Sequence, residues 1–237
     1  MSASDRYTAT RLGLQRVATH ILARARFDAD GRFGLRVTSS GIGTPAFGPD
    51  GEVIRIAGDM LIREFQEAGR TRTATATLVG RSLRELAAFA EVELTPSFGV
   101  GSDTPDLGDI EASIDLDVES AADLMAWLHV GSVALDRVVA FASEPSVAQV
   151  WPEHFDIGVD VATQMGRVNL GASPGDTDHP EPYLYVSPWE FSRPGDPAFW
   201  NAPFGAVAAR RVGESSVDPV DRAVKFFGTG LRLLEGE

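Results

Sequence analysis

Two short acidic segments in the second half of the chain carry residue types that could do chemistry. The candidate ligand-binding side chains in these segments are His154, Asp156, Asp176, Asp178, His179 and Glu181. Histidine with carboxylates can bind a hard or borderline divalent metal, or can act in general acid–base catalysis. His154 and His179 are the metal candidates, although their spacing matches no standard metal motif. The alternative is that Asp and Pro form turns here and that His154 caps a strand.

Aromatic residues gather in the same half of the chain. Tyr183 and Tyr185 alternate with Leu184 and Val186, so a strand here places both tyrosines on one face. Together with Trp200, these tyrosines complete the set of candidate site residues. An aromatic wall with a polar edge suits either a small-molecule pocket or an interface between subunits of a homo-oligomer. The alternative is that the rings simply fill the core of a sheet.

Two glycine motifs resemble functional loops but have the wrong context. Gly171–Gly175 fits the G-x-S-x-G pattern, yet Pro174 has no N–H for an oxyanion hole and no helix can follow. Gly41–Ala46 fits a dinucleotide-binding pattern, yet Pro45 and Pro49 forbid the helix that would hold a pyrophosphate. We therefore expect a tight loop at the first motif and a turn between strands at the second.

The first part of the chain predicts one long helix followed by an antiparallel meander. Apolar residues recur at helical spacing over residues 8–25. Polar and apolar residues then alternate, which predicts strands at 32–38, 52–57, 60–65 and 70–79. Ser82 with Glu85 forms a capping box that starts a short helix. Residues 94–109 are rich in Pro, Gly and Asp and read as a long loop or a linker.

The second part repeats this plan. An amphipathic helix is expected over residues 120–142, and strands at 155–162, 167–172, 183–187 and 204–209. Asp218 followed by Pro219 predicts the start of a closing helix. The predicted fold class is therefore α+β, with antiparallel sheets covered on one face by helices. The halves, residues 1–105 and 106–237, are expected to be similar, each with a helix, three or four strands and a helix, either as two lobes or as one continuous domain.

Composition excludes several kinds of function. The net charge is −13, which disfavours binding to nucleic acid or to an anionic membrane surface. The chain has no cysteine, and Lys225 is its single lysine, so thiolate chemistry is excluded and a Schiff base could form only at Lys225. No apolar stretch predicts a signal peptide or a membrane span. We expect a cytoplasmic protein, and the sequence leaves any cofactor open.

Four stretches of the second half resemble a group of uncharacterised conserved proteins of high-GC actinobacteria. The stretches are VWPEHFD at 150–156, GASPGD at 171–176, HPEPYLYV at 179–186 and FWNAPFGA at 199–206. That group has no established activity, so the resemblance transfers no catalytic residue. It implies a cytosolic bacterial protein.

Two functions of different classes remain open. In the first, the protein binds a small molecule, with or without catalysis, at a site in the second half. In the second, it is a protein–protein interaction or assembly module that uses its aromatic surface. The sequence does not decide between an enzyme and a binding protein.

Overall fold

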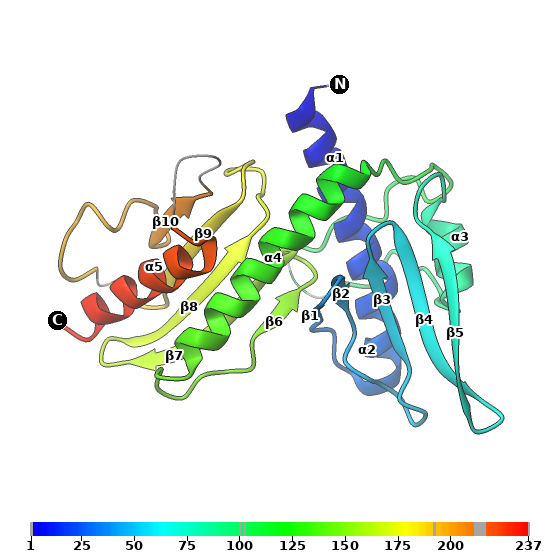
Figure 1. The fold of residues 1–237 in the computed structure, drawn as a ribbon, viewed down its shortest axis with the longest axis horizontal. Helices are drawn as coiled ribbons and strands as arrows, with labels where there is room; N and C mark the ends of the chain where they lie inside the picture. Colours follow the sequence, from blue (N-terminus) through cyan, green and yellow to red (C-terminus); the bar gives the residue numbers. More distant parts are fainter. Residues whose placement is uncertain (1, 100, 102, 192, 211–216, 237) are drawn as a thin grey trace. The chain divides into compact units, whose positions relative to one another are not determined.

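Two five-stranded antiparallel sheets and the helices packed against them make up an α+β fold in the computed structural model (Figure 1). The structure describes residues 2–99, 101, 103–191, 193–210 and 217–236. The chain divides into two units. The first comprises Met1–Ala126 with Val150–Phe155, and the second Trp127–Gln149 with Asp156–Glu237. The fold class expected from the sequence is confirmed, whereas the division into halves at residue 105 stays a prediction.

The first unit opens with a long helical segment that has a π-helical turn in its middle. It consists of α1 (Ala3–Val17), the π-helix η1 (Ala18–Ala23) and α2 (Arg24–Asp30), and a capping box of Ser2 and Asp5 starts it. It is longer than expected at both ends. Its apolar stripe is fully buried and consists of Leu14, Val17, Ala18, Ile21 and Leu22. In η1, Thr19 donates to the carbonyl of Pro152, and His20 Nε2 lies 2.6 Å from the carbonyl oxygen of Pro105.

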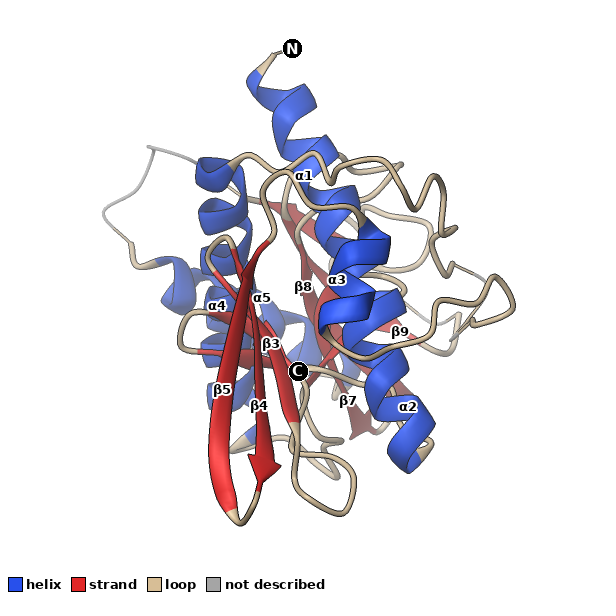
Figure 2. Cartoon of the chain, turned by 90° about the vertical axis from the view of Figure 1, so that its right-hand side faces the viewer, coloured by secondary structure: helices blue, strands red, loops and turns tan. Residues whose placement is uncertain are grey.

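The first sheet is a meander in which strands follow chain order. Its strands are β1 (Arg36–Thr38), β2 (Gly41–Gly43), β3 (Val53–Ala57), β4 (Met60–Glu67) and β5 (Arg70–Thr77). Ile54, Ile56 and Leu61 form its buried face. Helix α3 (Leu83–Phe89) follows, and its capping box of Ser82 and Glu85 is confirmed. Figure 2 shows β3, β4 and β5 side by side, with α3 next to the long helical segment.

The expectation that Gly41 and Gly43 form a turn is wrong. These residues form strand β2, which pairs with β1 on one side and β3 on the other. Because a Cβ at Gly41 would lie 2.2 Å from the carbonyl oxygen of Ile56, glycine is what lets the strand approach β3 this closely. The turn lies instead at residues 39–40.

The second sheet is the other meander, and its strands also follow chain order. After α4 (Val118–Val139) come β6 (Gln149–Trp151), β7 (Asp156–Thr163), β8 (Gly166–Ser173), β9 (Tyr183–Pro188) and β10 (Ala206–Ala209). Helix α5 (Pro219–Leu234) closes the chain, and Asp218 caps it as expected. Figure 1 shows α4 and α5 on one face of β7–β9. The contact is close, because a Cβ at Gly131 of α4 would lie 2.5 Å from the Cβ of Ala172.

The two expected loops have different outcomes. The expectation of a tight loop at residues 171–175 is wrong for Gly171, Ala172 and Ser173, which are the last residues of strand β8. The chain then leaves β8 without entering a helix, as the sequence predicts. The described residues of 94–109 contain no helix or strand. Among the described residues, no helix has both the length and the apolar character that crossing a bilayer requires.

Candidate functional site

The second sheet has one apolar face and one polar, aromatic face. Alternation along β7, β8 and β9 buries Ile157, Leu170, Ala172, Leu184 and Val186 on the side of the helices. The opposite face carries Asp156, Gly158, Asp160, Asn169, Gly171, Ser173, Tyr183 and Tyr185. The two tyrosines therefore share a face, as their alternation with Leu184 and Val186 predicts.

Tyr185 reaches across two strands to a buried carboxylate. Its hydroxyl donates a hydrogen bond of 2.5 Å to Asp156 Oδ2, although Tyr185 is on β9 and Asp156 is on β7. The ring crosses β8 at Gly171, where an added Cβ would lie 2.3 Å from the hydroxyl oxygen. Gly171 is thus required for this contact. Asp156 is 6% exposed, so the carboxylate and the hydroxyl meet away from bulk water.

Tyr183 makes a second pair of the same kind nearer to solvent. Its hydroxyl donates a hydrogen bond of 2.5 Å to Asp176 Oδ2. The backbone amides of Asp178 and His179 donate hydrogen bonds of 2.8 and 2.6 Å to Asp176 Oδ1. His179 Nδ1 lies 3.8 Å from the same Oδ1 atom, and the His179 ring centroid lies 5.0 Å from that of Tyr183 and 6.2 Å from that of Phe204. We call Asp176, His179, Tyr183 and Phe204 the His179 cluster.

The electrostatics keep the tyrosines protonated and Asp176 ionised. Burial opposes ionisation of Asp176, but hydrogen bonds from Tyr183 and from the amides of His179 and Asp178 lower its pKa below the ordinary value. Burial, reinforced by Asp176, raises the pKa of Tyr183. Burial, reinforced by the charge of Asp156, likewise raises the pKa of Tyr185 well above the ordinary value. Both hydroxyls are therefore fixed hydrogen-bond donors at neutral pH.

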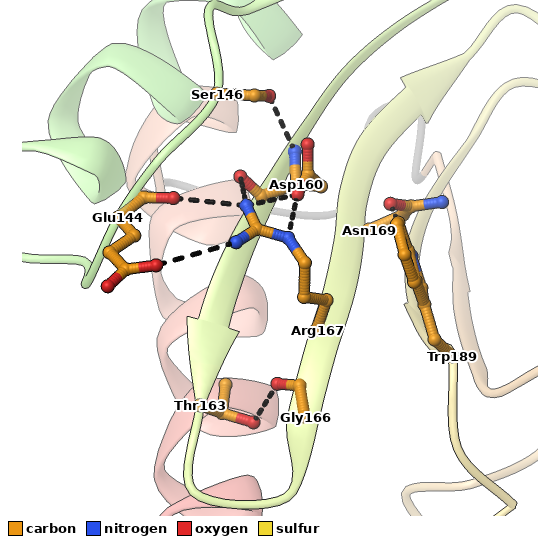
Figure 3. A network of polar contacts seen from close by, with 8 residues as sticks. All are labelled: Glu144, Ser146, Asp160, Thr163, Gly166, Arg167, Asn169 and Trp189. Atoms are coloured by element: carbon orange, nitrogen blue, oxygen red, sulfur yellow. Dashed lines mark hydrogen bonds and ion pairs between the residues drawn. The ribbon is translucent and has the colours of Figure 1, made fainter.

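The other end of the same face carries an ion-pair network (Figure 3). The guanidinium of Arg167 bonds the carboxylate of Asp160 and donates 3.0 Å to the carbonyl of Glu144. Trp189 Nε1 donates 3.0 Å to Asn169 Oδ1. The contact of Arg167 with Asp160 joins β8 to β7, and the contact of Trp189 with Asn169 joins the residue after β9 to β8. These contacts stabilise this end of the sheet.

The structure brings together some of the predicted site residues and separates others. Asp176, His179, Tyr183 and Tyr185 are neighbours, and Asp156 joins them through Tyr185. Asp178 and Glu181 are exposed in the loop between β8 and β9. Trp200 lies in a different aromatic group, with its ring 4.9 Å from that of Phe199 and its Nε1 donating to the carbonyl of Pro194.

His154 lies in the first unit and has its own partner. It is exposed, and its Nδ1 lies 3.5 Å from Asp103 Oδ2. In the part of the chain that the structure describes, no three His, Asp or Glu side chains gather as metal ligands would. The assignment of His154 and His179 to one metal site stays a prediction.

Sequence reasoning missed the roles of Gly171 and Phe204. Gly171 was visible only as part of the G-x-S-x-G pattern, and its real role depends on the register Gly171↔Tyr185, which a sequence does not reveal. Phe204 follows Pro203 in a loop, and nothing in its spacing predicts the contact with His179.

Comparisons of the chain with protein-family models, with curated proteins and with solved structures gave no match. The resemblance to actinobacterial proteins stays a prediction, and the chemistry of the site has to be argued from its geometry.

Proposed function

We propose that the protein binds a small cationic ligand, such as an amine or a quaternary ammonium compound, at the His179 cluster. The observation that supports this proposal is an ionised carboxylate, Asp176, next to His179 and Tyr183, with the ring of Phe204 on His179. A cation is attracted by the faces of aromatic rings and by a carboxylate next to them. The cytoplasmic location expected from the sequence is part of this proposal.

Accessibility and charge support the same conclusion. The side chains of Asp176 and His179 are 40% and 35% exposed, so a ligand can reach both. Three hydrogen bonds hold the Asp176 carboxylate in place, which means that binding needs little further ordering of it. The net charge of −13 also raises the local concentration of cations.

Nuclear magnetic resonance of labelled histidine tests the proposal. The chain has four histidines, so four ring signals are expected, and His179→Ala assigns one of them. Choline should shift the His179 signal saturably, whereas its neutral analogue 3,3-dimethylbutan-1-ol should not. The signal of exposed His129 on α4 serves as the internal reference.

Two matched variants locate the charge that matters. Asp176→Asn keeps an oxygen that can accept the hydrogen bonds of the two backbone amides, but it removes the negative charge. It should weaken choline binding at least about tenfold, equivalent to ~1.4 kcal/mol. Asp178→Asn, an exposed neighbour, should leave binding unchanged. A His179 signal indifferent to choline, or equal losses in both variants, would refute the proposal.

A second function, a protein–protein interaction module, is favoured by a different observation. Trp189 and Phe191, which follow β9, are 63% and 98% exposed. The hydrogen bond from Trp189 to Asn169 also holds the indole at the surface. Large exposed aromatic side chains that lie close together are typical of interaction sites. If Trp189→Ala with Phe191→Ala abolishes capture of a partner protein while choline still binds, this second function applies to a separate surface.

A further inference from the structure

The two sheets end at β1, β5, β6 and β10, and Val150 of β6 is already bridged to Leu35, the residue before β1. Strand β5 differs from the other three in its length. Strands β1 and β6 have three residues each and β10 has four, whereas β5 has eight. Short edges are a common protection against pairing with another chain. Strand β5 lacks that protection.

Strand β5 is also a regular strand. Its ladder with β4 runs without interruption from Met60↔Thr77 to Glu67↔Arg70, and its sequence, RTRTATAT, contains no proline. A bulge or a proline would mark an edge built to resist pairing. Residues 70–73 and Thr75 are exposed, so solvent reaches five of the eight residues of β5. Figure 1 shows β5 at the margin of its sheet.

The backbone groups that point outward belong to the threonines. The two-residue turn at Ala68 and Gly69, with positive φ at both, makes Glu67 and Arg70 a hydrogen-bonded pair. The N–H of Leu78 donates a hydrogen bond of 2.7 Å to the carbonyl of Asp59, which agrees with this alternation of hydrogen-bonded pairs. The backbone N–H and C=O groups of the even-numbered residues of β5 therefore point toward β4. The N–H and C=O groups that point away from β4 are those of Thr71, Thr73, Thr75 and Thr77.

We propose that β5 pairs antiparallel with β5 of a second copy of this chain, which joins the two first sheets into one. A two-fold axis perpendicular to the sheet requires residues on the same face to lie opposite each other. The register centred on Ala74 places Thr73 opposite Thr75 of the second copy, and Thr71 opposite Thr77. All four threonines are then in hydrogen-bonded pairs, whereas a register centred on Thr73 leaves Thr77 unpaired.

Charge distribution favours a second copy as the occupant. The charged residues of β5, Arg70 and Arg72, lie in its first half, and residues 74–77 are uncharged. Antiparallel pairing places the arginines of the two copies at opposite ends, with Arg72 opposite the small Ala76. Like charges directly opposite each other would destabilise the pairing, and the opposed threonines stabilise it.

A cysteine scan tests the register directly, because the chain contains no cysteine. Ala74→Cys places two sulfurs on opposed residues whose Cα atoms lie about 4.5 Å apart, within the range that a disulfide spans. Ala76→Cys, on the same strand and face, is the matched control, with its Cα atoms about 14 Å apart in this register. After mild oxidation, Ala74→Cys should run as a covalent dimer on a non-reducing gel and Ala76→Cys as a monomer.

Mass measurement by light scattering completes the test. The wild-type chain, 25.3 kDa as a monomer, should show twice that mass in solution. Thr73→Lys with Thr75→Lys opposes like charges across the pairing on an exposed face and should halve the mass, with an unchanged circular dichroism spectrum. A monomeric wild type, a dimer that survives this double variant, or equal crosslinking of the two cysteine variants would each overturn the proposal.

Discussion

At the scale of single residues, the paired tyrosines put similar chemistry in two different environments. Tyr185 donates to a carboxylate that is almost completely buried, while Tyr183 donates to one that is partly exposed and that two backbone amides already bond. A carboxylate that loses a donor away from water cannot replace it, whereas one near the surface can bond water instead. We therefore expect the Tyr185 pair to contribute more to stability, and the Tyr183 pair is the one with a partly exposed carboxylate.

Tyr185→Phe should lower the free energy of unfolding by about 2 kcal/mol at neutral pH, because it leaves a buried charged acceptor with one donor fewer. Tyr183→Phe should cost about half as much. Chemical denaturation of the two variants and the wild type measures the difference. Equal losses would show that burial does not separate the two pairs.

The same tyrosines set the alkaline limb of the stability curve. The pKa of each is raised in the folded protein, and an unfolded tyrosine ionises near pH 10. The unfolded chain then releases protons that the folded chain keeps, so stability is complete below about pH 10 and falls as pH rises through it. Tyr185→Phe removes one of these groups, and its stability should fall less steeply over this range.

At the scale of helices and strands, the sequence predicts the features that depend on residues close together along the chain. Ser82 with Glu85 and Asp218 with Pro219 start helices because their side chains and ring satisfy requirements within one turn. Strand alternation likewise placed Tyr183 and Tyr185 on one face. The π-helix at residues 18–23 and the three-residue strand β6 were not predicted, since neither leaves a periodic signal long enough to detect.

Contacts between strands limit how much of the site can be predicted. The pairing of Tyr185 with Asp156 depends on the registers β7–β8 and β8–β9, and shifting either one by a residue would move a partner to the other face. The sequence therefore supplied most members of the His179 cluster but not their pairing. It grouped Trp200 with them because the residues are close along the chain, whereas Trp200 packs with Phe199.

The packing of α4 on the second sheet gives a prediction for a single glycine. A Cβ at Gly131 would lie 2.5 Å from the Cβ of Ala172 and 2.8 Å from Ile157 Cγ2, so Gly131→Ala should destabilise the protein by about 2 kcal/mol despite the better helix propensity of alanine. Gly228 on α5 is the control, since the nearest atom to its Cβ would be Arg232 Nη1 at 3.7 Å.

Gly228→Ala should raise the free energy of unfolding by up to about 1 kcal/mol, because alanine has a higher helix propensity than glycine and its Cβ meets no clash at this position. Thermal or chemical denaturation of both variants should show changes of opposite sign. A stabilising Gly131→Ala would mean that α4 does not pack on β7 and β8 as closely as described.

At the scale of the whole molecule, the same plan occurs twice and most of the charge is acidic. Each sheet follows a long helical segment and has five strands paired in chain order. Several arginines of the first sheet are neutralised locally. Arg55 pairs with Glu64 at 3.1 Å, Arg72 with Glu67 at 2.9 Å, and Arg63 with Glu52 at 2.5 Å. These three arginines thus face carboxylates and add little positive charge to the surface of the sheet.

This charge distribution predicts that the protein does not bind nucleic acid at physiological salt. A phosphate backbone is held by Lys and Arg that displace its counterions, and arginines already paired with carboxylates would have to lose those partners first. The net charge of −13 adds a long-range repulsion.

Fluorescence anisotropy of labelled duplex DNA and single-stranded RNA should therefore show no saturable change on addition of the protein. Lowering the salt lengthens the range of the repulsion and should leave the result unchanged. Sub-micromolar binding that weakens as salt is added would contradict the prediction, and it would mean that a local basic surface outweighs the charge of the whole chain.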